Sequence, residues 1–505
     1  MNQITQESGA QKLNVIINGF VGDAGAQLLR KAFHPFSLGY CMSMCRDKNE
    51  IPQIVASELT WHQPGFLETV EWQHLRPVDE ALVEAMASCE AVFLHMMSRR
   101  ERGGRPLSYS VRKRRYLQVL QYWNHILEEN SIHLFLSYHI PHRDAAYVLY
   151  CLCRHKGIPI LMFRHIYAVP DTLLLFEDLE EPAPELPQRL KGIHDETAKQ
   201  SEKSASLSEH FEQYYVSQTT EKNPVPWSVQ VNKKAPGDVK RWWKMVVDIV
   251  YRNPLNSLSR MCRYLRKLCS ISYIMQMLRW GIALRRGSAF YRFYDRKAEH
   301  PNLDCRYIYI PLHLQPECST CPMGGAFADQ ILMVQLLASS LPQDVLLYVK
   351  EHPLQQKKHP DATGRDQWFY KDLLSIPSVR LVPRDFSTFP LMERCAAVAT
   401  VTGTAGFEAL FREKPVLVFG HHFYQYAPGV FPIRSRTDCK QAMEEIFQKG
   451  VKPTLQEIRC FLSALGDVGI TGYVDDFYEQ VSSLSPEENA EKVGATLAKR
   501  LSEVF

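Results

Sequence analysis

Short apolar runs alternate with longer amphipathic stretches along most of this chain of 505 residues. The alternation is typical of strands that connect through helices into a parallel sheet. It occurs in two series, and the length exceeds what one ordinary core accommodates, so we expect separate domains. The first series predicts strands over residues 13–18, 91–96, 134–137 and 159–163, with a helix over 145–156 that ends at Gly157.

The second series begins after residue 300. It predicts strands over residues 306–312, 345–350, 379–382, 397–401 and 415–419, with helices near 327–340 and 368–374. A closing helix near the end of the chain is indicated by a Ser-Pro-Glu-Glu start at Ser485 and by helical spacing of its apolar residues. The sequence therefore predicts α/β domains over 1–180 and 301–480, a linking segment over 181–300 and a closing segment over 481–505.

The linking segment changes from acidic to strongly basic along its length. Residues 238–297 contain fourteen Lys or Arg and three Asp, a net charge of +11, whereas the whole chain carries +4. Aromatic and aliphatic side chains are interleaved with these charges, which is typical of basic amphipathic helices that lie on an anionic membrane. A helical insertion that packs on the main body is the alternative. We expect no nucleic-acid partner, because no motif for nucleic-acid binding accompanies the charge.

The N-terminus and the cysteines bear on the compartment. Residues 1–12 are polar, and no apolar run reaches the roughly 18 to 20 residues that a spanning helix requires. We therefore expect a cytoplasmic protein, peripheral at the inner face of the membrane. The 13 cysteines are scattered and odd in number, which argues against a disulfide framework. Cys318 and Cys321 have the spacing of half a metal site but lack a matching second pair, so we predict no metal and no cofactor.

Polar residues follow the strands of the second series, at the edge where parallel sheets bind ligands. Lys350, His352 and Pro353 stand at the end of one strand, and Glu317 follows another. Lysine supplies a mobile positive charge, and histidine can donate to a phosphate oxygen or transfer a proton near neutral pH. These residue types predict one half of a phosphate-binding cleft.

A Gly/Thr turn follows the strand over 397–401 and completes this predicted cleft. Small residues there let a backbone approach a ligand closely, and the helix that starts after them would aim N–H groups and its positive dipole end at an anion. Glu408, early in that helix, is placed to accept both hydroxyls of a ribose. Turn formation or helix capping is the alternative for each residue, but their convergence at neighbouring strand ends favours nucleotide binding. The turn contributes Thr402, Gly403, Thr404 and Gly406.

These motifs resemble those of the capsule-polysaccharide biosynthesis family, which contains Kdo transferases of GT-B fold. The resemblance is carried by residues 307–317, 349–353, 400–410 and 414–420. It implies two Rossmann-like domains that face each other across a cleft, with the basic helical insertion between them. The family's His-Pro motif matches His352 and Pro353 and implies a cytidine nucleotide that leaves as CMP. Its Ser/Thr-rich phosphate motif corresponds to Thr402 and Thr404.

Transfer of a sugar from a nucleotide also requires a carboxylate near the anomeric carbon, as nucleophile or as base, besides groups that stabilise the departing phosphate. Glu317 is the candidate carboxylate, with Asp329 as a reserve, and His352 is the second predicted catalytic residue. Retaining and inverting mechanisms both stay open at this point.

Two stretches of the first domain follow predicted strands and are candidates for the acceptor site. The glycine-rich turn over 18–25 is interpreted as a connection between a strand and a helix, because a lone turn of this kind is a weak motif. The second stretch is the predicted acceptor site, because histidines and charged residues gather there at a strand end. Its residues are His139, His142, Arg143 and Asp144.

We therefore expect a glycosyltransferase that moves a Kdo- or sialic-acid-type sugar from a CMP-activated donor to a capsule or other cell-surface polysaccharide or glycolipid precursor. A CDP-polyol transferase of the glycerophosphate type is one alternative, since it would leave CMP in the same pocket. A non-catalytic, membrane-associated partner in polysaccharide assembly is the other.

Overall fold

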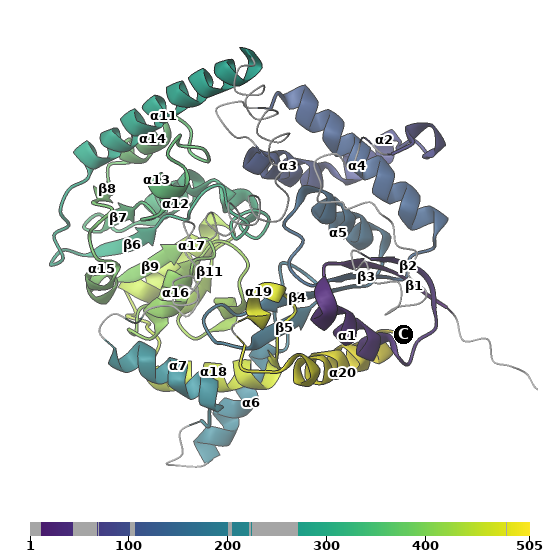
Figure 1. Ribbon diagram of the computed structural model, residues 1–505. Helices are drawn as coiled ribbons and strands as arrows, with labels where there is room; N and C mark the ends of the chain where they lie inside the picture. Colours follow the sequence, from purple (N-terminus) through teal and green to yellow (C-terminus); the bar gives the residue numbers. More distant parts are fainter. Residues whose placement is uncertain are drawn as a thin grey trace, which may run out of the picture.

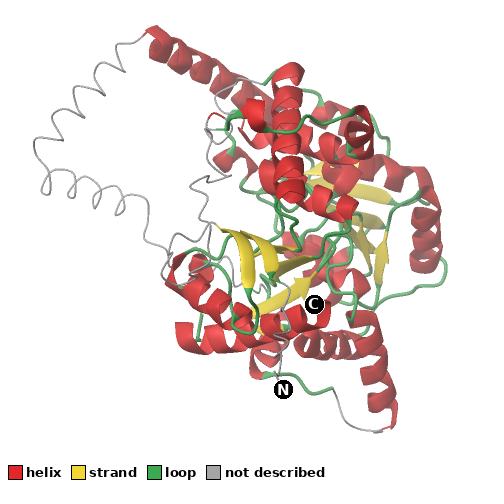
Figure 2. Cartoon of the chain, turned by 90° about the vertical axis from the view of Figure 1, so that its right-hand side faces the viewer, coloured by secondary structure: helices red, strands yellow, loops and turns green. Residues whose placement is uncertain are grey.

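The computed structural model describes residues 12–43, 68, 70–100, 107–199, 205–221, 224, 271–480 and 482–505. Over these ranges the chain folds into two sheets with helices packed around each of them (Figure 1). The strands form two separate groups when the molecule is turned by 90° (Figure 2). The prediction of two Rossmann-like α/β domains is confirmed.

The first sheet has six strands in the order β12-β5-β4-β3-β1-β2. The four strands from β2 to β4 run parallel, and β5 and β12 are antiparallel to their neighbours. Alternate residues of β1 face opposite sides, as the pleat requires. Ile16 packs with the layer of α3, α4 and α5, whereas Val15 and Ile17 pack with α1 and α20. The strands are β1 (Leu13–Asn18), β2 (Leu38–Ser43), β3 (Leu134–Ser137), β4 (Ile160–His165), β5 (Thr172–Phe176) and β12 (Ile470–Thr471).

The second sheet also has six strands, in the order β11-β10-β9-β6-β7-β8, and all of them are parallel. Numbered from β6, this is the doubly wound order 3-2-1-4-5-6, in which the direction of winding reverses between β6 and β9. Ligands of such sheets bind at this reversal. The strands are β6 (Tyr307–Pro311), β7 (Leu346–Lys350), β8 (Val379–Val382), β9 (Ala397–Thr400), β10 (Val416–Val418) and β11 (Val430–Pro432).

Helices cover both sheets. The first domain contains α1 (Gly22–Phe33), α2 (Glu80–Ala85), α3 (Ala87–Met96), α4 (Tyr109–Glu129) and α5 (Asp144–Lys156), with α6 (Leu186–Lys199) and α7 (Glu209–Thr220) after it. The second domain contains α11 (Ile271–Lys297), α12 (Gln330–Ser340), α13 (Gln355–Lys358), α14 (Phe369–Leu374), α15 (Thr388–Arg394), α16 (Thr404–Leu410) and α17 (Arg436–Phe447). The chain ends with α18 (Leu455–Val468), α19 (Asp476–Glu479) and α20 (Pro486–Val504).

One predicted strand is wrong. Residues 91–96 form the second half of helix α3, and the strand beside β1 is instead β2. A short apolar run does not distinguish a buried strand from a buried helix. Counted from the start of α3, the buried residues Cys89, Phe93 and Met96 have helical spacing, which becomes visible only when the run is extended backwards.

After the second sheet the chain returns to the first domain. Helix α18 packs against α6 and α7, β12 pairs with β5, and α20 lies along α1. Gly494 allows the last contact, since a Cβ atom there would lie 2.8 Å from the Cβ of Lys31. The predicted domain boundary at residue 480 therefore falls after the chain has rejoined the first sheet.

The basic segment over 238–297 is described only in part. Residues 238–270 lie outside the described residues, and 271–297 form α11. The C-terminal half of α11 packs on the second domain, where Tyr291 and Tyr294 are fully buried and the Tyr291 hydroxyl donates to the carbonyl of His359 over 2.7 Å. Among the helices that the structure describes, none combines the length and the apolar character needed to cross a bilayer.

Candidate active site

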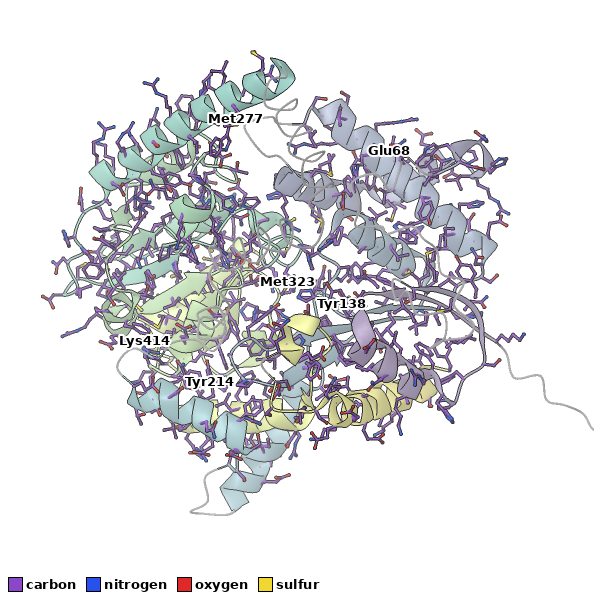
Figure 3. All side chains as sticks on the ribbon, in the orientation of Figure 1. Glu68, Tyr138, Tyr214, Met277, Met323 and Lys414 are labelled. Atoms are coloured by element: carbon purple, nitrogen blue, oxygen red, sulfur yellow. The ribbon has the colours of Figure 1, made fainter. Side chains whose placement is uncertain are left out.

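A cavity of about 620 Å³ lies between the two sheets, and residues of both domains line it. The second domain contributes the ends of β6, β7 and β9 and the loops that follow them. Met323, one of the lining residues, is labelled between the two domains in Figure 3. From the first domain come His139, Ile140, His142, Arg164 and Tyr167.

Lys350 is the last residue of β7 and is almost fully buried. Its ammonium group donates to the hydroxyl of Thr388 over 3.0 Å. Burial lowers the pKa of Lys350 to about 8, and the negative charge of Asp385 offsets part of this effect. The ammonium group is therefore still mostly charged at neutral pH, and it lies at a wall of the cavity.

The imidazole of His352 is fixed by the turn that follows β7. Its Nδ1 accepts the backbone N–H of Leu354 over 3.1 Å, so the neutral ring carries its proton on Nε2. Burial lowers the pKa of His352, which favours this neutral form. His352 thus offers an N–H donor in the cavity without bringing a second full charge beside Lys350.

A buried ion pair holds this turn in place. Arg365 donates to both carboxylate oxygens of Glu351, over 3.1 and 3.0 Å, and both side chains are almost completely buried. Glu351 also accepts the hydroxyl of Tyr370 over 2.7 Å and the backbone N–H of His352 over 2.7 Å. Because its oxygens are fully engaged, Glu351 positions His352 and is not available to substrate.

The same ion pair reaches the end of β6 through His313. Arg365 donates to the carbonyl of His313 over 2.7 Å. The ring of His313 accepts the backbone N–H of Thr402 at Nε2 over 3.2 Å and lies 3.1 Å from the hydroxyl of Thr400. Burial lowers the pKa of His313 to about 3, so the ring is neutral and serves as an acceptor. His313 therefore ties β6 to the turn after β9.

The turn after β9 has space only for glycine at two positions. A Cβ atom on Gly403 would lie 2.7 Å from the hydroxyl of Thr400, and one on Gly406 would lie 2.8 Å from the hydroxyl of Tyr424. Thr402 donates to the carbonyl of Ser319 over 2.8 Å. The first N–H groups of a helix lack intrahelical acceptors, and Thr404 and Ala405, which begin α16, line the cavity.

Glu317 is the remaining carboxylate among the cavity-lining residues, since Glu351 is committed to Arg365. Burial raises the pKa of Glu317, while a hydrogen bond from Ser319 and the charges of Lys358 and Arg99 act in the opposite direction. A carboxyl group with a raised pKa suits proton transfer near neutral pH. Asp329 does not line the cavity. Its side chain instead caps α12 by accepting the backbone N–H of Ile331 over 3.0 Å.

Comparison with known proteins identifies the second domain. Residues 306–442 match the family described as "Capsule polysaccharide biosynthesis protein". We refer to residues 306–442 as the capsule-family segment, after this match. The capsule-family segment contains β6 to β11 and every second-domain residue that lines the cavity.

Solved structures resemble the chain only distantly. They include the beta Kdo 2,7 transferase of Thermosulfurimonas dismutans KpsC, with 12% identity over 77% of this chain and 97% of that chain and a TM-score of 0.28. The UDP-GlcNAc 2-epimerase of Neisseria meningitidis bound to UDP-GlcNAc has 12% identity over 98% of this chain and 99% of that chain, with a TM-score of 0.22. Scores this low establish neither a shared domain arrangement nor a shared activity. No curated protein matches the sequence.

The cavity brings together most of the predicted donor-site residues of the capsule-family segment. Gly406 and Glu408 are not among its lining residues. Gly406 lies against Tyr424, and the electrostatic neighbours of Glu408 are Arg412 and the neutral phenols of Tyr214, Tyr309 and Tyr424. The predicted ribose contact of Glu408 therefore has no support in this geometry. The residues that do line the cavity are Glu317, Lys350, His352, Pro353, Thr402, Gly403 and Thr404.

The predicted acceptor residues divide into two pairs. His139 and His142 line the cavity, with their Nδ1 atoms 3.2 Å apart, and burial lowers the pKa of both rings. Arg143 is exposed and does not line it. Asp144 begins α5, where it is buried and forms an ion pair with Arg115 over 3.3 Å. These two residues are therefore outside the cavity.

The glycine-rich turn over 18–25 connects β1 to α1. Gly19 and Gly22 have φ values of +89° and +85°, which favour glycine. None of the turn residues lines the cavity, in agreement with its interpretation as a connection. Cys318 and Cys321 are free cysteines, and the described residues contain no group of three or more His, Cys, Asp or Glu arranged to hold a metal ion.

Several cavity residues were not predicted as site residues. Arg164, His313 and His422 line the cavity, and Arg365 supports it from behind. The signal for Arg164 is present in the sequence, because it is a charged residue inside the apolar run Ile160–His165, all of which is buried. Arginine is rarely buried in such a run unless a partner or a ligand pairs with its charge.

Proposed function

We propose that this protein is a glycosyltransferase that moves a Kdo- or sialic-acid-type sugar from a CMP-activated donor to a capsule or other cell-surface polysaccharide or glycolipid precursor. The observation that carries the proposal is the convergence of Lys350, His352 and the turn at Thr402 on one cavity, which also contains Glu317. These residues converge where the direction of winding of the second sheet reverses, within the capsule-family segment.

Two sets of groups in the cavity would have different roles in the reaction. The Lys350 ammonium group and the Nε2–H of His352 would stabilise the charge that develops on the departing nucleotide phosphate. Glu317 would act on the sugar or on the acceptor hydroxyl, as nucleophile or as base. His139 and His142 lie on the first-domain wall of the same cavity, where an acceptor would approach.

The test is a donor screen with the purified full chain and its variants. We expect transfer with a CMP-linked sugar acid and not with UDP-linked hexoses or CDP-linked polyols. Glu317→Gln should lower the rate by about 10²-fold or more, on the scale of general acid–base contributions. His352→Ala should lower it by about 10²-fold through loss of a donor to the phosphate.

The matched control for these variants is Glu445→Gln, which alters a half-buried glutamate that lies outside the cavity and pairs with Lys449. It should leave the rate unchanged. Full transfer by both Glu317→Gln and His352→Ala would show that the active site lies elsewhere. Transfer from a CDP-polyol alone would replace the proposed donor class.

We also propose that the protein works at the cytoplasmic face of a membrane, with an anionic lipid surface as partner of the basic segment. The support comes from the described part of α11. Its N-terminal half exposes Met277, Leu278, Trp280 and Ile282, with exposed fractions between 44% and 58%. Arg279, Arg285 and Arg286 are exposed on the same helix. Figure 3 shows Met277 near the N-terminal end of this helix.

A further inference from the structure

Arg164 is a buried charge without a carboxylate partner among the residues that the structure describes. It lies in β4 and lines the cavity from the first domain, with a relative exposure of 4%. Its Nη1 atom has no hydrogen-bond partner, and no carboxylate among the described residues forms an ion pair with it. A desolvated, unpaired charge is costly in a protein interior. Such a group is retained where a ligand supplies the missing countercharge.

The neighbours of Arg164 do not neutralise it. Burial lowers the pKa of Arg164 to about 10, so the guanidinium is charged at neutral pH. Two of its neighbours, His139 and His422, have pKa values lowered chiefly by burial and are neutral. Tyr167 and Tyr424 are its other electrostatic neighbours, and both phenols have raised pKa values. The positive charge therefore remains uncompensated.

Neither carboxylate of the cavity pairs with Arg164. Glu351 forms the ion pair with Arg365. Glu317 interacts with Lys358 and Arg99, and Arg164 is not among the groups that shift its pKa. The cavity consequently has two separate cationic positions, Lys350 on the second-domain wall and Arg164 on the first-domain wall. A ligand with two anionic groups would fit this distribution of charge.

We propose that Arg164 binds the carboxylate of a sugar acid through its guanidinium fork. The planar fork of arginine matches a planar carboxylate with two hydrogen bonds. A phosphate already has Lys350, His352 and the turn at Thr402 on the opposite domain. His422 supports the assignment, because its Nδ1 is a second buried polar atom without a partner at the same cavity and can bond a sugar hydroxyl. This inference rests on the proposed function and names the group that distinguishes its substrate from neutral sugars.

The binding test uses three probes with the full chain: CMP, free Kdo and the methyl ester of Kdo. Titration of CMP-saturated wild-type protein should show the free acid binding about tenfold more tightly than the ester, as expected for a charge-assisted pair. In Arg164→Gln the acid and the ester should bind equally, while CMP binding stays within about twofold of wild type. Arg164→Lys should retain part of the preference, since it keeps the charge and loses the fork.

A stability measurement tests independently whether the charge of Arg164 is unpaired. Removing an unpaired buried charge should raise the thermal unfolding midpoint, so Arg164→Met should melt a few degrees above wild type in the absence of ligand. The matched control is Arg189→Gln, which alters a partly exposed arginine that pairs with Asp467 and Glu196. This variant should change neither binding nor melting.

Each other outcome decides against the inference. Equal binding of acid and ester by wild type, or no binding of either, would exclude a carboxylate site. A loss of CMP binding in Arg164→Gln would assign the residue to the phosphate, and a lower melting midpoint for Arg164→Met would give it a structural role. Failure of wild type to bind CMP would instead count against the proposed nucleotide donor, whatever Arg164 does.

Discussion

At the scale of single residues, burial sets the charge of each group in the cavity. Lys350 and Arg164 keep their positive charges with lowered pKa values, whereas His313 and His352 stay neutral. The result is a site that offers cations at two walls and neutral donors between them. Such an arrangement is suited to an anionic substrate whose charge must be stabilised as a bond breaks.

The lowered pKa of Lys350 predicts how CMP binding depends on pH. Above about pH 7 the phosphate is fully ionised, so the lysine, with a pKa of about 8, is the group that titrates. As the pH rises through this value the ammonium group loses its proton, and CMP should bind about tenfold more weakly at about pH 9 than at about pH 7. Calorimetric titration at several pH values measures this change in CMP affinity. Lys350→Arg stays charged and should give a flat profile, and a flat profile for wild type would refute the role of Lys350.

The pair of Glu351 and Arg365 predicts a large loss of stability when one partner is removed. Glu351→Gln leaves the arginine buried without a countercharge, and we expect the free energy of unfolding to fall by about 3–5 kcal/mol. Chemical denaturation of the full chain measures the change. Asp344→Asn, which breaks the exposed pair with Arg306, should cost less than about 1 kcal/mol. Equal losses in the free energy of unfolding would show that the buried pair stabilises the protein no more than the exposed pair does.

At the scale of elements, strand ends place the proposed catalytic groups, and α18 and α20 return the chain to the helices of the first domain. The sequence allowed the prediction of every strand of the second sheet except β11, and of the polar residues at three of their ends. It did not allow the prediction of α3, because a six-residue apolar run fits either a strand or a helix. Arg164 was missed for another reason: its strand belongs to the first domain, and only the arrangement of both domains brings it to the cavity.

Gly494 illustrates a sequence feature whose meaning depends on packing. Taken alone it weakens a helix, yet α20 needs it where it crosses α1, since an added Cβ would approach the carbonyl of Leu28 to 3.1 Å as well as Lys31. Gly494→Ala should therefore destabilise the protein by about 1–3 kcal/mol through overpacking.

Gly281 provides the matched comparison for this prediction. It lies in α11, and a Cβ atom there would meet nothing within 4 Å. Gly281→Ala should stabilise the protein by about 0.5–1 kcal/mol through helix propensity. Denaturation of both variants by urea measures the two effects, and a stabilised Gly494→Ala would contradict the close crossing of α1 and α20.

At the scale of the whole molecule, the cavity between the domains and the apolar surface of α11 belong to different regions. The cavity lies between the two sheets, whereas α11 lies along the outside of the second domain (Figure 1). The proposed membrane contact through α11 would therefore not cover the cavity.

This surface predicts salt-sensitive binding to anionic vesicles. The full chain should sediment with phosphatidylserine-containing vesicles at low salt and be released as salt is raised. Trp280→Glu should reduce the bound fraction several-fold, because it places a negative charge among exposed apolar and basic side chains. The control variant is Phe505→Glu, which alters a similarly exposed aromatic residue directly after α20. It should bind the vesicles like wild type. Absence of binding at low salt would contradict the membrane proposal.

The donor that we propose requires the cavity to hold a cytidine nucleotide against Lys350 and His352. Calorimetric titration of CMP and UMP into the full chain tests it most directly. We expect saturable CMP binding at one site per chain, weaker binding of UMP, and a loss of at least about tenfold in CMP affinity for Lys350→Met. No CMP binding, or CMP binding that Lys350→Met leaves unchanged, would contradict it.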